Sequence, residues 1–154
     1  MSALISFASQ FGAKIMLNPE FIVENAQRYY FINPALRKLA RRDFYYAGLY
    51  LGKVKKGVFF PSFNLLNMLV ATAANKVILD RKTAWLYICG RDVFRTGILK
   101  MTGSKRKGDA TLVLNEFGEC LGFGRIMGQI DESGKNDIII KNVSDVGDFL
   151  RRER

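Results

Sequence analysis

The side chains that most often do chemistry in enzymes are sparse in this chain. It contains no histidine, which removes the commonest general base and the commonest metal ligand. The acids Asp43, Asp92 and Asp109 lie in different predicted elements without a paired partner, so the sequence offers no nucleophile–base set, although lysine or carboxylate bases stay possible. We therefore expect a protein that is not an enzyme and that needs no cofactor.

Two cysteines stand far apart, at Cys89 and Cys120, each inside an apolar stretch. Zinc sites need ligands in closely spaced pairs, so this spacing predicts no metal site. It favours two buried thiols in an intracellular protein and leaves a disulfide between them open.

Basic residues give the chain its chemical character. It has 24 Lys and Arg against 14 Asp and Glu, a formal charge of +10. Residues 1–75 hold nine basic and three acidic residues, and residues 76–154 hold fifteen and eleven, so the excess is spread along the chain. This charge favours a polyanionic partner, nucleic acid before membrane, over a protein that is merely soluble and basic. A binding surface then has to come from clustering in the fold.

Three groups of basic side chains are candidates for phosphate contacts. One follows the last predicted helix, where one or two cations would complement the helix dipole and a third exceeds what a cap needs. Another lies in the loop 103–108, for which a solvated hairpin tip is the slightly favoured alternative. The third comprises two strand residues. The full set of candidates is Arg151, Arg152, Arg154, Lys105, Arg106, Lys107, Lys141 and Arg125.

Aromatic residues could add base stacking to these charges. The candidates are Tyr29, Tyr30, Tyr45, Tyr46 and Trp85. Each sits in a strand pattern, so core packing is the better interpretation for most of them.

The elements that must position these residues centre on 109–126, which is predicted as a β-hairpin. Leu112 and Leu114 alternate with their neighbours at the period of a strand, and the turn falls at 115–118. Gly122 and Gly124 are two residues apart on the return strand, so both missing side chains lie on one face. We expect a notch there, where another backbone approaches closely. A bend or bulge is a better interpretation than a phosphate cradle, because no helix follows.

Before residue 75 the pattern mixes helices and strands. Helices are predicted at 4–11, from 33 to about 42 and at 62–74, with strands at 13–17, 28–32, 45–54 and 58–60 and a turn or short helix at 18–19. Beyond it strands are short, at 77–79, 84–88, 98–101 and 138–140, with one helical turn in 90–94 and a last helix capped by Ser144. The fold class is therefore α+β, an α+β domain over residues 1–75 followed by a β-barrel domain over 76–154, packed together without a long linker.

The second half resembles a PUA domain, the RNA-binding pseudo-barrel named for pseudouridine synthases and archaeosine transglycosylases. Residues 86–94, 112–114 and 121–124 carry this resemblance. The whole chain resembles the ribosome-biogenesis factors of the Nip-seven family, and it resembles an archaeal member more than a eukaryotic one. Residues 47–53, 62–74 and 145–152 carry this resemblance.

That resemblance implies an N-terminal α/β sandwich-like domain and a C-terminal PUA-like pseudo-barrel. It also implies a non-enzymatic RNA-binding factor in large-subunit assembly and pre-ribosomal RNA processing. RNA would bind the basic C-terminal surface through phosphates, and ribosome-assembly proteins would dock on the N-terminal domain. The alternatives are a protein–protein adaptor, favoured if the basic residues of 76–154 are scattered, and a non-catalytic RNA-delivery subunit of an RNA-modification enzyme. Residues 1–10 lack a signal peptide and no stretch is long enough to span a membrane, so we expect a cytoplasmic protein, or a nucleolar one in a eukaryote.

Overall fold

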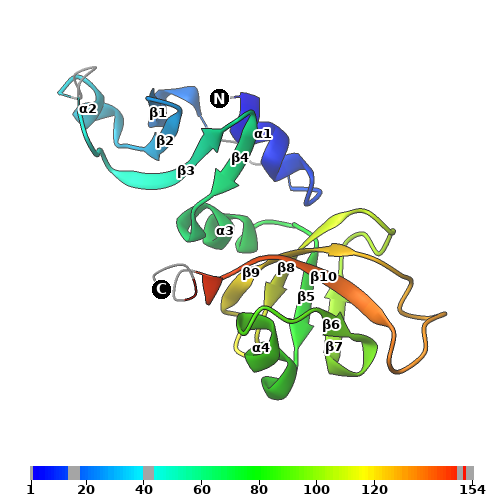
Figure 1. Cartoon of the computed structure of the whole chain (residues 1–154). Helices are drawn as coiled ribbons and strands as arrows, with labels where there is room; N and C mark the ends of the chain where they lie inside the picture. The colour runs from blue at the N-terminus through cyan, green and yellow to red at the C-terminus, as the bar shows by residue number, and fades with distance from the viewer. Residues whose placement is uncertain (1, 14–17, 40–43, 149–150, 152–154) are drawn as a thin grey trace.

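The strands of this protein form two separate sheets, and the change from one to the other falls close to residue 75 (Figure 1). The computed structural model describes residues 2–13, 18–39, 44–148 and 151. A four-stranded antiparallel sheet has the order β1-β2-β3-β4, and a six-stranded sheet that curls into a half-barrel has the order β6-β10-β9-β8-β5-β7. The expected mixed fold with a PUA-like half-barrel is thus present, whereas the division into two domains over residues 1–75 and 76–154 stays a prediction.

The N-terminal sheet is built from two tight hairpins. Its strands are β1 (Ile22–Asn25), β2 (Arg28–Phe31), β3 (Leu49–Lys55) and β4 (Val58–Pro61). Both hairpins turn through two residues with positive φ, Ala26 with Gln27 and Lys56 with Gly57. Such turns match the right-handed twist of the strands they join.

Short helices surround the two sheets, and several of them begin with a side-chain cap. They are α1 (Ser2–Ser9), the 3-10 turn η1 (Pro19–Phe21), α2 (Pro34–Arg37), α3 (Phe63–Val70), α4 (Arg81–Ile88) and the 3-10 turn η2 (Arg95–Gly97). The side chains of Asn18, Asn33 and Ser62 accept hydrogen bonds from the first-turn amides of η1, α2 and α3. Caps of this kind confirm the predicted starts at 18–19, 33–34 and 61–62.

Strand β8 is buried on both faces and joins the two halves. The six-stranded sheet comprises β5 (Lys76–Leu79), β6 (Val93–Phe94), β7 (Ile98–Thr102), β8 (Ala110–Leu114), β9 (Cys120–Ile126) and β10 (Ile138–Asp145). Leu112 and Leu114 pack in the same core as α1 and α3, whereas Val113 faces the interior of the half-barrel. The predicted hairpin at 109–126 is confirmed, since β8 and β9 pair antiparallel.

An aromatic cluster closes the contact between the halves. The ring of Phe123 in β9 lies 5.5 Å from Phe7 and 5.7 Å from Phe11, in both cases edge to face. Edge-to-face pairs of this kind add to what burial alone contributes. The first helix is therefore packed against the half-barrel as well as against its own sheet.

The glycine notch is confirmed, and β10 occupies it. A Cβ at Gly124 would lie 2.5 Å from the carbonyl oxygen of Lys141, and one at Gly122 would collide with the backbone of Ser144. Gly122 also has a φ of +149°, a conformation that other residues rarely adopt. Both glycines let β10 cross β9 closely.

Four expectations about elements were wrong. A helical turn was expected in 90–94, but Val93 and Phe94 form the strand β6, and the 3-10 turn η2 follows only at Arg95–Gly97. Residues 84–88 form a helix because Asp80 accepts a hydrogen bond from the Thr83 amide at 2.7 Å, so the supposed turn at 80–83 is a helix cap. Ser144 lies inside β10 and caps nothing; helical structure begins again only at Asp148. The third strand starts at Leu49 and not at residue 45.

Several predicted segments lie partly outside the described residues. These are the strand at 13–17, the end of the helix predicted to run to about residue 42, and most of the last helix.

Candidate nucleic-acid interface

The loop between β7 and β8 presents three basic side chains to solvent. Lys105, Arg106 and Lys107 are all exposed. Arg106 forms an ion pair with Asp109 at 3.3 Å, whereas neither lysine forms an ion pair with a described residue. The two lysines are therefore the members of this loop whose charge is available to an external anion.

A buried asparagine and a short acid-centred turn hold this loop in shape. The side chain of Asn75 accepts a hydrogen bond from the Ser104 amide at 2.7 Å and donates one to the carbonyl of Ala110 at 3.0 Å. The Ser104 hydroxyl donates to Asp109. This hydrogen bond, with the charge of Arg106 acting in the same direction, holds the pKa of Asp109 below its ordinary value. Asp109 thus stays ionised and keeps the turn closed at neutral pH.

Arg125 and Lys141 lie directly opposite each other on β9 and β10. The Arg125 guanidinium donates to the carbonyl of Gly108 at 2.9 Å and to Oε1 of Gln10 at 3.5 Å, so it ties the lysine loop to the end of the first helix. Lys141 pairs with Asp92 at 2.9 Å. The structure therefore brings Arg125 and Lys141 to the same region as the loop 103–108. The charge of Lys141 is already paired with Asp92, and the Arg125 guanidinium already donates to oxygens of the protein.

Arg151 is held at the other end of β10. Its guanidinium donates to Asp145 at 2.7 Å and to the carbonyl of Ile88 at 2.6 Å. Asp145 is only 2% exposed, and Asn142 donates to the same carboxylate oxygen. Arg151 thus neutralises a buried acid, a role that the sequence did not reveal. Arg152 and Arg154, predicted beside it, lie outside the described residues, so the single cationic face expected of these residues with Lys141 and Arg125 stays a prediction.

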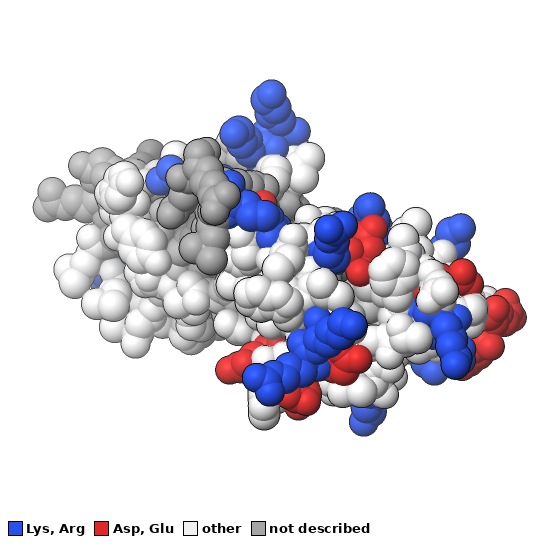
Figure 2. Space-filling model, turned by 60° about the horizontal axis from the view of Figure 1, so that its bottom comes forward, with Lys and Arg blue, Asp and Glu red and all other residues white. Residues whose placement is uncertain are grey.

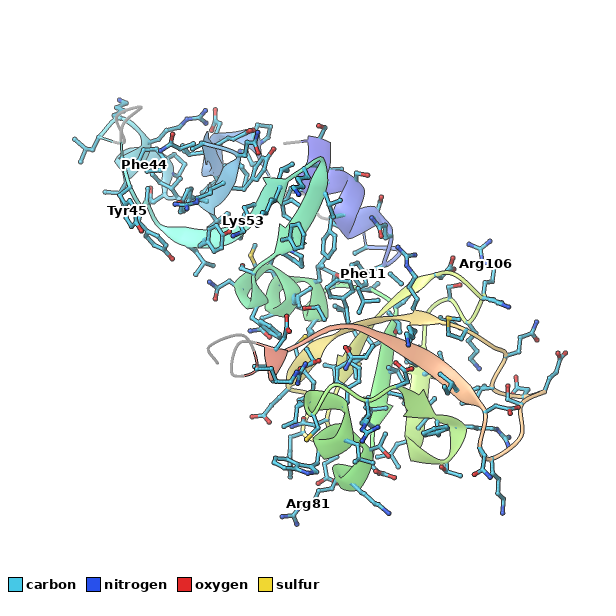
Figure 3. All side chains as sticks on the ribbon, viewed as in Figure 1. Phe11, Phe44, Tyr45, Lys53, Arg81 and Arg106 are labelled. Carbon is cyan, nitrogen blue, oxygen red and sulfur yellow. The ribbon has the colours of Figure 1, made fainter. Side chains whose placement is uncertain are left out.

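Charges of both signs are mixed on one side of the half-barrel. Figure 2 shows blue and red side chains interspersed over the C-terminal strands on that face. Figure 3 shows Arg106 and Arg81 at opposite sides of the half-barrel. The basic residues that could bind a polyanion are therefore those that stand away from acids, chiefly Lys105 and Lys107.

Helix α4 exposes an aromatic residue that the sequence pattern had favoured for the core. Trp85 is 64% exposed because residue 85 lies on the outer side of a helix and not in a buried strand. With Phe117, which is 79% exposed at the β8–β9 turn, it borders a shallow pocket of about 240 Å³. The other residues around this pocket are Arg81, Ala84, Ile88, Asn115, Glu116 and Leu121.

The four tyrosines predicted as stacking candidates divide into two groups. Tyr29 and Tyr30 are buried, as expected, whereas Tyr45 is 85% and Tyr46 58% exposed. Both exposed tyrosines precede the third strand, so the strand pattern that had favoured core packing does not hold for them.

Within the described parts of the chain, no three His, Cys, Asp or Glu side chains converge as ligands for a metal ion. The cysteines are free, Cys89 exposed and Cys120 half-buried. Burial raises the pKa of the Cys120 thiol to about 11, well above the range in which it would be a ligand or nucleophile at neutral pH.

Of the helices that the structure describes, none has the length and apolar character needed to cross a membrane.

Comparison with known proteins matches the C-terminal half to one family and the whole chain to two archaeal structures. Residues 75–154 match the family described as UPF0113 PUA domain. A conserved PUA domain protein from Thermoplasma acidophilum is 22% identical with a TM-score of 0.64, and the match covers 99% of this chain and 92% of that one. A hypothetical protein from the hyperthermophilic archaeon Pyrococcus horikoshii OT3 is 18% identical with a TM-score of 0.62 and the same coverage.

A PUA domain from Aeropyrum pernix K1 is 19% identical with a TM-score of 0.51, over 61% of this chain and 55% of that one. Because these identities are between 18% and 22%, the similarity to the three structures shows a shared fold only. No curated protein matches the sequence significantly.

Proposed function

Since the chain belongs to the UPF0113 PUA domain family, we propose that it is an RNA-binding protein that acts without catalysis and without a cofactor. The observation that carries this proposal is the family match over residues 75–154, because a PUA domain implies RNA binding. The formal charge of +10 supports it, since phosphates supply most of the affinity for a basic partner.

The contact surface that we assign to RNA is the corner of the half-barrel formed by the loop 103–108 with Arg125 and Lys141. Lys105 and Lys107 are exposed and carry no ion pair to a described residue. Asn75 and Arg125 fix both ends of the loop through backbone carbonyls and amides. A cationic loop that is already ordered loses little conformational freedom on binding. Arg152 and Arg154 belong to the proposal as further phosphate contacts.

We place this activity in assembly of the large ribosomal subunit and processing of pre-ribosomal RNA. The support is the resemblance of residues 47–53, 62–74 and 145–152 to the Nip-seven factors. In this proposal the N-terminal half also docks ribosome-assembly proteins.

A second candidate is a protein–protein adaptor. It is favoured by the mixed charges in Figure 2 and by the apolar pocket between Trp85 and Phe117, whose exposed rings suit a protein partner.

Crosslinking the protein in cells and sequencing the attached RNA tests the assignment. The expected result is enrichment of large-subunit ribosomal or pre-ribosomal RNA over a Lys105→Gln/Lys107→Gln variant expressed at the same level. Enrichment of substrates of RNA modification would instead indicate an RNA-delivery subunit. Recovery of proteins with no attached RNA would contradict RNA binding and favour the adaptor.

A further inference from the structure

The N-terminal sheet has one covered face and one open face. Tyr29, Leu51 and Phe59 point to the covered side and pack in the core that contains α1 and α3, with Phe59 5.2 Å from Phe7. No described helix lies over the opposite side (Figure 1). We call this opposite side the open face and define it by Arg28, Lys53, Phe60, Tyr45 and Tyr46.

Strand register lines up cations and an aromatic ring across the open face. Arg28 lies opposite Lys53, and Lys53 lies opposite Phe60, so the three residues form one row across β2, β3 and β4. Phe60 is 43% exposed although it is apolar, and both cations are exposed. Residues opposite one another in a sheet have side chains close enough to share one ligand.

The segment before β3 adds two tyrosines and is held on the sheet. The side chain of Asn25 donates to the carbonyl of Phe44 at 2.6 Å, and the hydroxyl of Tyr30 donates to the carbonyl of Tyr45 at 3.3 Å. The ring of Tyr46 lies 5.3 Å from that of Tyr30. Figure 3 shows Phe44, Tyr45 and Lys53 along the same sheet, away from the half-barrel. The backbone that carries both tyrosines is therefore held against the sheet, and the Tyr46 ring packs on Tyr30.

The open face is cationic. Neither Arg28 nor Lys53 forms an ion pair with any residue that the structure describes. Arg28 also lies near Tyr50, where its charge opposes the rise in the pKa of Tyr50 that burial causes. Among residues 1–75, basic residues outnumber acids by nine to three.

We propose that the open face binds a single-stranded segment of RNA, with bases stacked on Tyr45, Tyr46 and Phe60 and phosphates held by Arg28 and Lys53. Unpaired bases can reach exposed rings, whereas bases within a duplex cannot, and aromatic residues on a four-stranded sheet are an established way to bind unpaired RNA. The inference rests on the proposed RNA-binding function and adds a second surface to the lysine loop. A protein partner would instead favour a more apolar patch with fewer uncompensated cations.

Binding of the full chain to a fluorescein-labelled single-stranded oligouridylate and to a hairpin of the same length tests the proposal. Tyr45→Ala and Phe60→Leu each remove one stacking ring, and we expect a loss of about 5-fold or more for the single strand, with less effect on the hairpin. Phe117→Leu is the control, because Phe117 is also an exposed ring, 79% against 43% for Phe60, and lies on another element. Tyr45 is 85% exposed, so its variant decides the outcome if Phe60→Leu lowers the melting temperature.

The charges are tested by salt dependence. Arg28→Gln/Lys53→Gln should lower the slope of log affinity against log salt by about 1.4 for single strands, whereas Arg81→Gln/Lys82→Gln on α4 should leave it unchanged. Photo-crosslinks from 4-thiouridine should fall within residues 44–61.

If the parent binds neither probe, the proposed function itself fails. If the parent binds RNA but the open-face variants match it and crosslinks are confined to residues 103–141, the open face is no RNA site and belongs to another partner.

Discussion

Asn75 connects three parts of the molecule. Its backbone amide donates to the carbonyl of Phe11 at 2.7 Å, and its carbonyl accepts from the Leu112 amide at 2.9 Å. Its side chain bridges Ser104 and Ala110 while being only 5% exposed. One buried amide therefore joins the end of the first helix, the lysine loop and β8.

Asn75→Ala should destabilise the fold by about 1–3 kcal/mol, because it leaves the Ser104 amide and the Ala110 carbonyl without their partner in a buried site. The free energy of unfolding in urea measures this. Asn67→Ala, at an exposed position of α3, is the control and should change stability by less than about 0.5 kcal/mol. Equal stability of the two variants would show that water replaces the Asn75 side chain without loss.

The two thiols should differ in reactivity. Burial raises the pKa of Cys120 to about 11, so near pH 8 only about one Cys120 thiol in a thousand is the reactive thiolate, while Cys89 is exposed. Iodoacetamide at pH 8 should therefore modify Cys89 first. The Cys120 rate should rise about tenfold per pH unit up to about pH 10 and then level off near its pKa, because well below the pKa each unit raises the thiolate fraction about tenfold. Mass spectrometry of the native protein follows both sites, and parallel modification at pH 8 would contradict the assignment.

Among single residues, Arg151 shows the limit of reading charge from sequence. Three arginines near the chain end are visible in the sequence, but the partner of Arg151, Asp145, is six residues away and faces it only because the chain turns at Gly147. The sequence shows that residue 151 is a cation, but not that a buried acid engages it.

At the level of elements, helix α4 and strand β8 show what local pattern can decide. Residues 84–88 are aromatic and apolar, which suits a strand, yet the Asp80 cap and the exposure of Trp85 show a helix with one face in solvent. Strand β8 was predicted correctly, but the burial of its second face depends on α1 and α3, which come much earlier in the chain. The hydrophobic period of a strand and the residues of its turns can be read from neighbouring positions in the sequence. The number of faces of that strand that become buried depends on elements far away in the chain.

The crossing of β9 and β10 is the element that should tolerate change least. Gly122→Ala places a methyl group against the Ser144 carbonyl and 2.8 Å from the Cα of Asp145, at a φ that alanine resists. We expect a loss of about 3 kcal/mol or more. Gly118→Ala in the hairpin turn has a positive φ but nothing within 4 Å, so it should cost about 1 kcal/mol. Thermal unfolding of both variants measures the difference, and equal melting temperatures would mean that β10 moves aside freely.

Across the whole molecule, the two sheets share one core through Phe7, Phe11 and Phe123. The sequence predicted two halves and their order because hydrophobic period and turn frequency change near residue 75. It could not predict which basic residues are left unpaired, since Lys141, Arg106 and Arg151 each find an acid through the fold. Charge counted along a chain is therefore a guide to the class of partner and a poor guide to the contact residues.

Those ion pairs determine which variants can test RNA binding by the half-barrel. Lys105→Gln/Lys107→Gln removes two exposed charges with no described ion-pair partner, so each lost phosphate contact should lower the salt slope by about 0.7 to 0.9 and the pair by about 1.4 to 1.8. Lys82→Gln/Lys100→Gln changes the net charge equally on exposed parts of α4 and β7, and should leave the slope near that of the parent.

Arg151→Ala is unsuitable as a test, because it would leave the buried Asp145 without its partner and confound RNA binding with stability. Sequence preference should stay constant in the first variant, since phosphate contacts position RNA without reading bases. Equal slopes for both double variants, measured by titration between about 50 and 200 mM salt, would move the phosphate contacts away from the loop 103–108.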